Sequence, residues 1–328
     1  MSEADKDAQG DAQSDAQSDA KSAAKKDEKK HAKGEAALDA VTELRIGGVD
    51  VFIEGAGAET IVMIHGWPDT YRLWDAQVAA LKADFRCVRF TLPGFDIDKE
   101  RRPYSLDLTM RMFDNIIRQV NAGQRVILML HDWGAVFGYQ FSMRYPKLVS
   151  RIVGVDIGDV ETQTYRGSLS LMAKLKIAAY QLWLAAAWRI AGDMGEKMTH
   201  YMVRKLRAPS DPQYISSGMN YPYYITWSSA HGSYQHAQAF TPKVLMLFIY
   251  GSKKPFMFHS PQWLRGLMKL GCKVLAFKTG HWPMVEQPEV FNREVADWLH
   301  ATRSKAVIAA EASAAADAAA DDAEENAA

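Results

Sequence analysis

The chain has 328 residues, and its 39 lysine and arginine residues balance 39 aspartate and glutamate residues, so the formal net charge is zero. This balance, and the lack of a basic pattern interleaved with aromatic side chains, argue against nucleic-acid binding. Cys87 and Cys272 cannot form a disulfide framework, and no secretory apolar segment follows Met1, so we expect a cytoplasmic protein.

The two ends of the chain have a composition that does not favour a folded domain. Residues 1–40 contain repeats of Asp, Ala, Gln and Ser followed by a lysine-rich run, and residues 304–328 are mostly alanine. Such segments lack the large apolar side chains that offset the entropy lost on ordering. We therefore expect a disordered low-complexity extension at 1–40 and a disordered Ala-rich tail at 304–328.

Between these ends, strand and helix patterns alternate. An opening hairpin is predicted over residues 44–53, and strands over 61–64, 86–92, 126–130, 152–155, 244–250 and 274–277. Helices are predicted over 71–81, 106–120, 135–145 and 288–299. Strands separated by helices imply right-handed crossovers, and hence an α/β fold with a mostly parallel sheet flanked by helices.

One long segment interrupts this alternation. Residues 160–240 have aromatic-rich helical patterns and no strand signal, which predicts a helical cap inserted between two parts of a core at 41–159 and 241–303. The most apolar stretch, 177–188, is too short to cross a bilayer. We interpret it as a cap helix and expect no membrane span.

The first chemical motif follows the strand over 61–64. It reads His65-Gly66-Trp67-Pro68. Gly66 permits a tight turn, and Pro68 fixes the backbone just past Trp67. The backbone N–H of Trp67 is then free to point into a cavity, where it could stabilise a developing oxyanion.

The most informative motif is Leu130-His131-Asp132-Trp133-Gly134, in which a buried strand ends and a helix begins. In the nucleophile elbow such a turn lifts one side chain above a parallel sheet, and the N–H of the next residue, here Trp133, completes the oxyanion hole. A carboxylate nucleophile forms an ester by attacking saturated carbon, which indicates alkyl rather than acyl substrates. The alternative is that Asp132 only caps the following helix.

His281 comes directly after the last predicted strand, where a general base is needed. The order of oxyanion loop, nucleophile, long insert and histidine is that of an α/β-hydrolase. Over residues 41–303 the chain resembles the α/β-hydrolase superfamily, and within it the branch of soluble epoxide hydrolases and haloalkane dehalogenases that use Asp as the nucleophile. The motifs at 65–68 and 131–134 carry this resemblance.

The third member of the triad departs from the commoner family pattern. Epoxide hydrolases usually carry the acid after the penultimate strand as Gly-x-x-Asp, and this chain has Lys254 in that place. A cation there would repel the imidazolium that forms during turnover. One class of haloalkane dehalogenase has the acid at the end of the strand after the elbow, which implies Asp156, with Asp159 or no acid as alternatives.

The resemblance also implies two cap tyrosines that protonate the epoxide oxygen. Tyr180-Gln181-Leu182 is similar to the family's first tyrosine motif. The second is expected at Tyr221, with Tyr223 as the alternative, because the match of residues 220–223 is off by one residue.

The expected function is hydrolysis of a small apolar epoxide to a vicinal diol through a hydroxyalkyl ester on Asp132. In this scheme His281 activates water and Asp156 holds the imidazole. No metal-ligand spacing is evident, so no metal or organic cofactor is expected.

Two alternatives remain. A haloalkane dehalogenase would use the same nucleophile, and Trp133 could donate its indole N–H to the halide. The Asn that such enzymes usually have in place of Trp67 is absent. A non-catalytic small-molecule-binding protein of the same fold is the other alternative, for which Lys254 would mark a lost triad.

Overall fold

In a computed structural model, the chain is described over residues 40–232, 234 and 236–303. Apart from residue 40, the predicted disordered segments 1–40 and 304–328 lie outside these residues.

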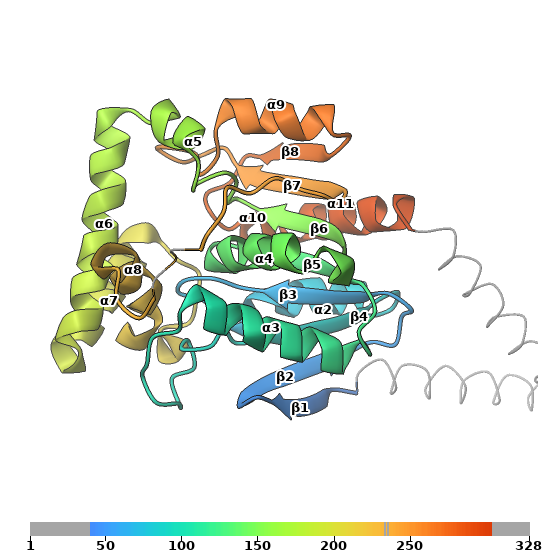
Figure 1. Ribbon diagram of the computed structural model, residues 1–328, viewed down its shortest axis with the longest axis horizontal. Coiled ribbons are helices and arrows are strands. Elements are labelled where there is room, and N and C mark those ends of the chain that lie inside the picture. The colour runs from blue at the N-terminus through green and yellow to red at the C-terminus, as the bar shows by residue number, and fades with distance from the viewer. Residues whose placement is uncertain (1–39, 233, 235, 304–328) are drawn as a thin grey trace, which may run out of the picture. The chain divides into compact units, whose positions relative to one another are not determined.

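An eight-stranded sheet forms the centre of the fold (Figure 1), in the order β1-β2-β4-β3-β5-β6-β7-β8. The strands are β1 (Thr42–Ile46), β2 (Val49–Glu54), β3 (Thr60–Ile64), β4 (Arg86–Phe90), β5 (Val126–His131), β6 (Val149–Val155), β7 (Met246–Gly251) and β8 (Lys273–Phe277). β1 and β2 form the predicted hairpin, β2 pairs antiparallel with β4, and the remaining pairs are parallel. The prediction of a mostly parallel sheet is confirmed.

Helices cover both faces of this sheet. They are α2 (Asp75–Leu81), α3 (Leu106–Val120), α4 (Trp133–Arg144), α9 (Pro261–Lys269), α10 (Pro283–Glu286) and α11 (Pro288–Ala301), with the 3-10 turns η1 (Tyr71–Trp74) and η2 (Pro146–Leu148). Figure 1 shows α3 and α4 on the face nearer the viewer.

Alternate side chains of the central strands enter two different hydrophobic layers. Val62 and Leu128 pack in the layer that contains α3 and α4. Ile61 and Met129, one residue away in the same strands, pack in the layer that contains α2 and α11. Because neighbouring side chains of a strand point to opposite faces, both layers need apolar residues, which explains the continuous apolar runs in the sequence.

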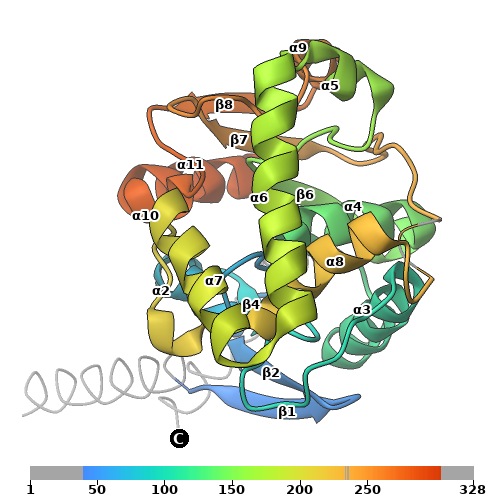
Figure 2. The same ribbon diagram turned by 90° about the vertical axis from the view of Figure 1, so that its left-hand side faces the viewer.

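The segment between β6 and β7 is helical. It contains α5 (Gln163–Ser168), α6 (Leu171–Ile190), α7 (Gly192–Leu206) and α8 (Tyr221–Ser228), with the 3-10 turns η3 (Pro212–Tyr214) and η4 (Ser217–Asn220). α6, α7 and α8 lie together at one end of the sheet, as both views show (Figure 1, Figure 2). We call residues 160–240 the cap, and its limits stay a prediction.

Several element boundaries differ from the sequence prediction. The predicted helix over 71–81 is divided into η1 and α2, because Trp74 leaves the helical region with φ −96° and ψ 9°. The predicted strand over 86–92 ends at Phe90, before Pro93 and Gly94. The apolar stretch 177–188 is part of the longer helix α6, which starts where the Ser170 side chain accepts a hydrogen bond from the backbone N–H of Ala173. Helix α9 was not predicted.

Within the described residues, we find no helix that combines the length and the apolarity required to cross a membrane.

Candidate active site

Asp132 lies at the sharp turn between β5 and α4, with φ 50° and ψ −124°. A positive φ is strained for a residue with a side chain and persists only where the surroundings hold it. Two glycines permit this turn. A Cβ atom on Gly134 would lie 2.3 Å from the backbone oxygens of Ile64 and His65, and one on Gly66 would lie 2.4 Å from Asp132 Oδ1. The loop after β3 and the turn after β5 are therefore in direct contact.

The carboxylate of Asp132 faces the predicted oxyanion donors. The backbone N–H of Trp67 donates to Oδ1 at 2.7 Å, and the backbone N–H of Trp133 contributes to lowering the pKa of the same carboxylate. The Asp132 side chain makes no capping hydrogen bond to α4. The alternative that Asp132 only caps this helix is therefore wrong.

The oxyanion loop is held from two sides. The backbone N–H of Leu92 donates to His65 Nε2 at 2.8 Å, and burial lowers the pKa of His65 to about 4, which keeps this acceptor free of a proton. On the cap side, Trp67 Nε1 donates to Asn220 Oδ1 at 2.7 Å, and Asn220 Nδ2 donates to Thr199 Oγ1 at 2.7 Å. The indole of Trp67 is thus bound to the cap.

His281 follows β8 and lies between two carboxylates. Its Nε2 is 3.5 Å from Asp132 Oδ2, and its Nδ1 donates to Asp156 Oδ2. Asp156 is fully buried at the end of β6, and its Oδ1 accepts a hydrogen bond from the backbone N–H of Gly251 at 2.9 Å. The structure therefore brings together the predicted nucleophile, base and acid.

The charges of these residues shift one another's pKa values. Burial favours the neutral imidazole of His281, but the negative charges of Asp156 and Asp132 outweigh it and raise its pKa to about 9. Burial also favours protonation of Asp156, yet His281 and Lys254 lower its pKa to about 2. Burial also favours protonation of Asp132, but the contact with His281 outweighs it, so the pKa of Asp132 is lowered. At neutral pH the site holds two carboxylates around a protonated imidazole.

Lys254 does not act as the sequence analysis expected. Instead of facing His281 as a repelling charge, its Nζ forms an ion pair with Asp156 Oδ1, while His281 binds Oδ2 of the same carboxylate. The Lys254 side chain is only 7% exposed. The carboxylate thus lies between two cations, and the lysine supports the acid from the position that the acid itself occupies in the commoner family pattern.

Asp159, the alternative acid, is engaged elsewhere. Its Oδ1 accepts from the backbone N–H of Ser260 at 2.7 Å, and its Oδ2 accepts from Ser260 Oγ at 2.7 Å and from Thr162 Oγ1 at 2.8 Å. Ser260 in turn caps α9. The geometry gives Asp159 the task of joining the start of the cap to α9.

Two cap tyrosines lie near the nucleophile. The ring of Tyr223 is 5.3 Å from that of Trp133 and 6.1 Å from that of Tyr180, measured between centroids. Burial raises the pKa of both phenols well above the usual range, and the charge of Asp132 adds to each rise. Both tyrosines therefore remain protonated near Asp132.

Tyr221, the second tyrosine expected from the sequence, lies in a different environment. Its ring is fully buried against Phe95 and Tyr104, with centroid distances of 5.8 and 5.9 Å. Its edge contacts Gly94, where an added Cβ atom would lie 2.7 Å from the Tyr221 ring. Tyr221 thus packs the cap against the loop after β4, whereas Tyr223 lies against Trp133, where the charge of Asp132 reaches its phenol.

The sequence analysis missed a set of buried polar contacts among His131, Asp69 and Trp282, next to His281. His131 Nε2 donates to the backbone oxygen of His281 at 3.0 Å, and His131 Nδ1 is 3.9 Å from Asp69 Oδ2. Trp282 Nε1 donates to the same Asp69 oxygen at 3.0 Å, and burial raises the pKa of Asp69 to about 6. His131 lies within the motif at 130–134, Asp69 follows the motif at 65–68, and Trp282 follows His281, but only the fold places these three side chains together.

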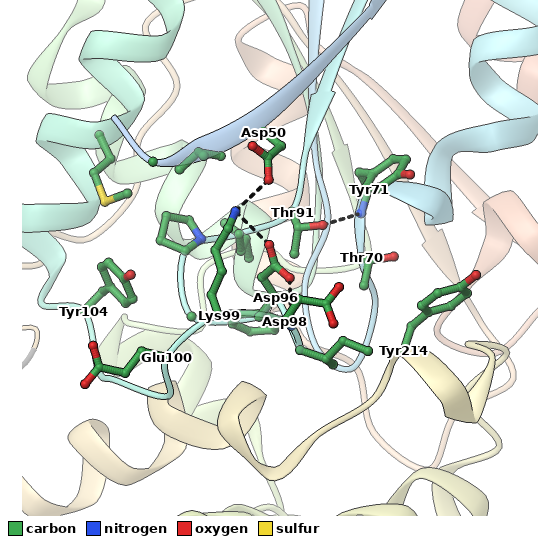
Figure 3. Close-up of a pocket in the computed structure, with 18 of the residues that line it drawn as sticks. Asp50, Thr70, Tyr71, Thr91, Asp96, Asp98, Lys99, Glu100, Tyr104 and Tyr214 are labelled. Atoms are coloured by element: carbon green, nitrogen blue, oxygen red, sulfur yellow. Dashed lines mark hydrogen bonds and ion pairs between the residues drawn. The ribbon is translucent and has the colours of Figure 1, made fainter. Parts of the chain in front are cut away.

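A hollow of about 370 Å³ lies apart from the triad (Figure 3). Lys99 extends there between Asp50 and Asp96, at 2.9 and 2.8 Å from their carboxylate oxygens. None of Asp132, Asp156 and His281 lines it. Among the described residues, no three His, Cys, Asp or Glu side chains are grouped so that they could hold a metal ion.

Comparisons with known proteins find partial sequence matches to epoxide hydrolases. An epoxide hydrolase of Neurospora crassa is 36% identical over 98 residues, which cover 28% of this chain and 29% of the relative. Epoxide hydrolase 3 of Mus musculus is 31% identical over 96 residues, covering 28% of this chain and 26% of the relative. Each match spans less than a third of the relative's length.

Two solved structures share the fold. The epoxide hydrolase of Bacillus megaterium in complex with an inhibitor matches with a TM-score of 0.58 and 20% identity, over 79% of this chain and 100% of that one. An epoxide hydrolase of Vigna radiata matches with a TM-score of 0.56 and 15% identity, over 80% of this chain and 97% of that one. A model of the alpha/beta hydrolase family matches residues 61–294, so this chain belongs to the alpha/beta hydrolase family.

Proposed function

We propose that this protein opens a small apolar epoxide to a vicinal diol through a covalent hydroxyalkyl ester on Asp132. The observation that carries the proposal is the pair of protonated phenols, Tyr180 and Tyr223, beside a carboxylate at a nucleophile turn. An opened epoxide leaves as an alkoxide and needs a proton donor, and a halide does not. The epoxide hydrolases among the relatives support the same reaction.

In the first half-reaction Oδ2 of Asp132 attacks an epoxide carbon. Oδ1 is held by the N–H of Trp67, so Oδ2 is the oxygen available for attack. The new bond joins Oδ2 to the carbon as the carbon–oxygen bond of the epoxide breaks. Tyr180 or Tyr223 donates its proton to the departing oxygen, which becomes the hydroxyl of the ester intermediate.

In the second half-reaction, His281 becomes a base only after Asp132 has lost its negative charge. Once Asp132 is an ester its negative charge is gone, so one of the two charges that raise the pKa of His281 is removed. His281 can then give its proton, by way of solvent, to the phenolate that Tyr180 or Tyr223 became in the first half-reaction. The neutral imidazole next deprotonates a water, while Asp156 holds the ring. The resulting hydroxide attacks the ester carbonyl carbon. The N–H groups of Trp67 and Trp133 stabilise the oxyanion. As the ester carbon–oxygen bond breaks, the departing alkoxide takes the proton of the new carboxyl group, so the diol leaves and the carboxylate re-forms.

The two alternatives have less support. The indole N–H of Trp67 is bound by Asn220, which leaves that of Trp133 as the halide donor considered for a dehalogenase. A non-catalytic binding protein would have no need for a nucleophile at a strained turn in contact with a base and an acid.

The test is intact-protein mass spectrometry after incubation with styrene oxide or 1-bromobutane. His281→Gln should accumulate the mass of one styrene oxide, because attack by Asp132 precedes the need for a base. Asp132→Asn should show no added mass, because the amide is a poor nucleophile of the same shape. An adduct on Asp132→Asn would remove Asp132 from its role, and an alkyl adduct with bromide release from 1-bromobutane alone would favour the dehalogenase.

A further inference from the structure

Helix α6 of the cap exposes an apolar face along its whole length. The large side chains on it, with their exposed fractions, are Leu171 (74%), Met172 (60%), Leu175 (55%), Leu182 (47%), Trp183 (38%) and Ile190 (55%). The exposed residues Ala179 and Ala186 fill the spacing between them. Steps of three and four residues place these side chains on one side of a helix. We call this set the α6 face.

The α6 face points away from the rest of the protein except at Trp183, whose indole N–H donates to the backbone oxygen of Met198 and whose ring packs on Tyr201 of α7. The buried residues in the same part of the helix are Leu184, Ala185 and Ala187, and α6 contacts α7 and α8. Figure 2 shows α6 nearest the viewer across the cap, with no described element in front of it. Contiguous exposed apolar surface of this kind marks an interaction site, whereas single exposed apolar residues are ordinary.

The charges around the α6 face indicate the partner. Lys174 and Lys176 flank its first half and Arg189 lies near its end, and all three are exposed. Helix α6 contains no aspartate or glutamate. A second copy of this chain, related by a two-fold axis, would bring the same cations of both α6 helices together with no carboxylate from either helix to pair with them. An anionic surface complements this pattern, and a second copy does not.

We propose that the α6 face lies on the surface of a membrane that contains anionic lipids. The apolar side chains would enter the boundary between headgroups and acyl chains, and the three cations would contact lipid phosphates. This inference concerns a surface of the cap and does not depend on the chemistry of Asp132.

The experiment is co-sedimentation of the full chain with vesicles of phosphatidylcholine alone or of phosphatidylcholine and phosphatidylglycerol in equal parts. The wild-type protein should bind the mixed vesicles more tightly, and added salt should weaken the binding. The double variant Leu175→Glu with Leu182→Glu should lose binding. Lys174→Gln with Lys176→Gln should bind mixed vesicles more weakly, by roughly fivefold per lost cation.

Met268→Glu with Leu270→Glu is the matched control, because these two side chains, at and just after the end of α9, are 55% and 56% exposed but lie outside the α6 face. This variant should bind like the wild type. Circular dichroism should show that all variants are folded, which keeps the test independent of enzymatic activity.

Three outcomes would overturn the proposal. The wild-type protein could fail to bind either vesicle, or the α6 face variant could bind as well as the control variant. Light scattering could instead show a dimer that dissociates only in the α6 face variant, without vesicle binding. That last result would assign the face to a second copy of the chain.

Discussion

Lys254 and His281 bind opposite oxygens of Asp156, so the proposed acid of the triad divides its negative charge between two cations. The carboxylate is fully buried, and water therefore screens neither contact effectively. The strength with which Asp156 holds the proton on His281 depends on the lysine. At the scale of single residues, Lys254 thus adjusts the base without touching the reacting atoms.

Replacing Lys254 by methionine should move the pH dependence of the second half-reaction. Once Asp132 is an ester, the pKa of His281 should be higher in this variant than in the wild-type protein, because the charge of Asp156 then acts on the imidazole without the opposing lysine cation. The rate of ester hydrolysis should then begin its rise at higher pH, which single-turnover decay of the alkyl-enzyme would measure. Lys253→Met is the control, since Lys253 is an exposed neighbour. Identical profiles for the two variants would contradict this role.

The cap tyrosines give a second prediction. Tyr180→Phe and Tyr223→Phe should each slow formation of the ester from an epoxide by roughly 10²–10⁴-fold, the contribution of a general acid. Tyr224→Phe should have little effect, because Tyr224 stacks on Trp188 with 4.3 Å between ring centroids. Rapid-quench measurement of the covalent intermediate reports this step alone. A large loss in Tyr221→Phe, with none in Tyr223→Phe, would return the role to Tyr221.

At the scale of elements, the site depends on close contact between the loop after β3 and the turn after β5. Gly134, in the first turn of α4, lies directly against the backbone of Ile64 and His65. The hydrogen bond from Trp67 to Asp132 requires the same approach. A change that separates these two segments should therefore affect both stability and the oxyanion hole.

Gly134→Ala tests this contact. Its Cβ atom would lie 2.3 Å from two backbone oxygens, so the segments must move apart, and we expect a loss of about 1–3 kcal/mol in the free energy of unfolding together with slower ester formation. Gly167→Ala is the matched control, because an added Cβ atom in α5 meets nothing within 4 Å and alanine is favoured in a helix by about 1 kcal/mol. Urea unfolding of both variants checks this. Equal stability of Gly134→Ala and the wild-type protein would contradict the tight approach.

At the scale of the whole molecule, buried neutral histidines make the folded state sensitive to acid. Burial lowers the pKa of His65 and His259 to about 4 and that of His131 to about 3. An unfolded chain takes up these protons below pH of about 6.5, and the folded protein does not until the lower pKa values are reached. Stability should therefore fall as the pH falls from about 6.5 to 4. His281 contributes no slope there, because it is protonated in both states.

His259→Phe should reduce this sensitivity. His259 is buried against Phe248 and Tyr250 and lies outside the proposed mechanism. Removing its proton uptake should lower the slope of unfolding free energy against pH by at most about 1.4 kcal/mol per pH unit between pH 4 and 6.5. The raised pKa of Asp69, about 6, makes the folded protein more stable as the pH falls through this range. This contribution is the same in the wild-type protein and in His259→Phe, so it does not affect the difference between their slopes. Urea titrations at several pH values measure the slope, and an unchanged slope would contradict the prediction.

The backbone features of the site were predictable because their signals are local. A buried run that ends in Asp132 before a helix, and Gly66 with Pro68 after another run, specify turns through the residues of those turns alone. The alternation of strands and helices predicted the mostly parallel sheet, which the structure confirms. The helix α9 escaped prediction, and the cap helix α6 was predicted too short.

Tertiary structure decided the contacts between segments that are distant in the sequence. Asp156 and Asp159 have similar sequence surroundings, but Asp156 meets His281, whereas Asp159 binds Ser260. Lys254, read from the sequence as a repelling charge, supports the acid because β6 and β7 are neighbours in the sheet. The sequence alone determined where the chain turns, since a turn is specified by a few adjacent residues. Which side chains meet in a buried site depends on the packing of the whole sheet and cap, and short-range patterns contain no record of it.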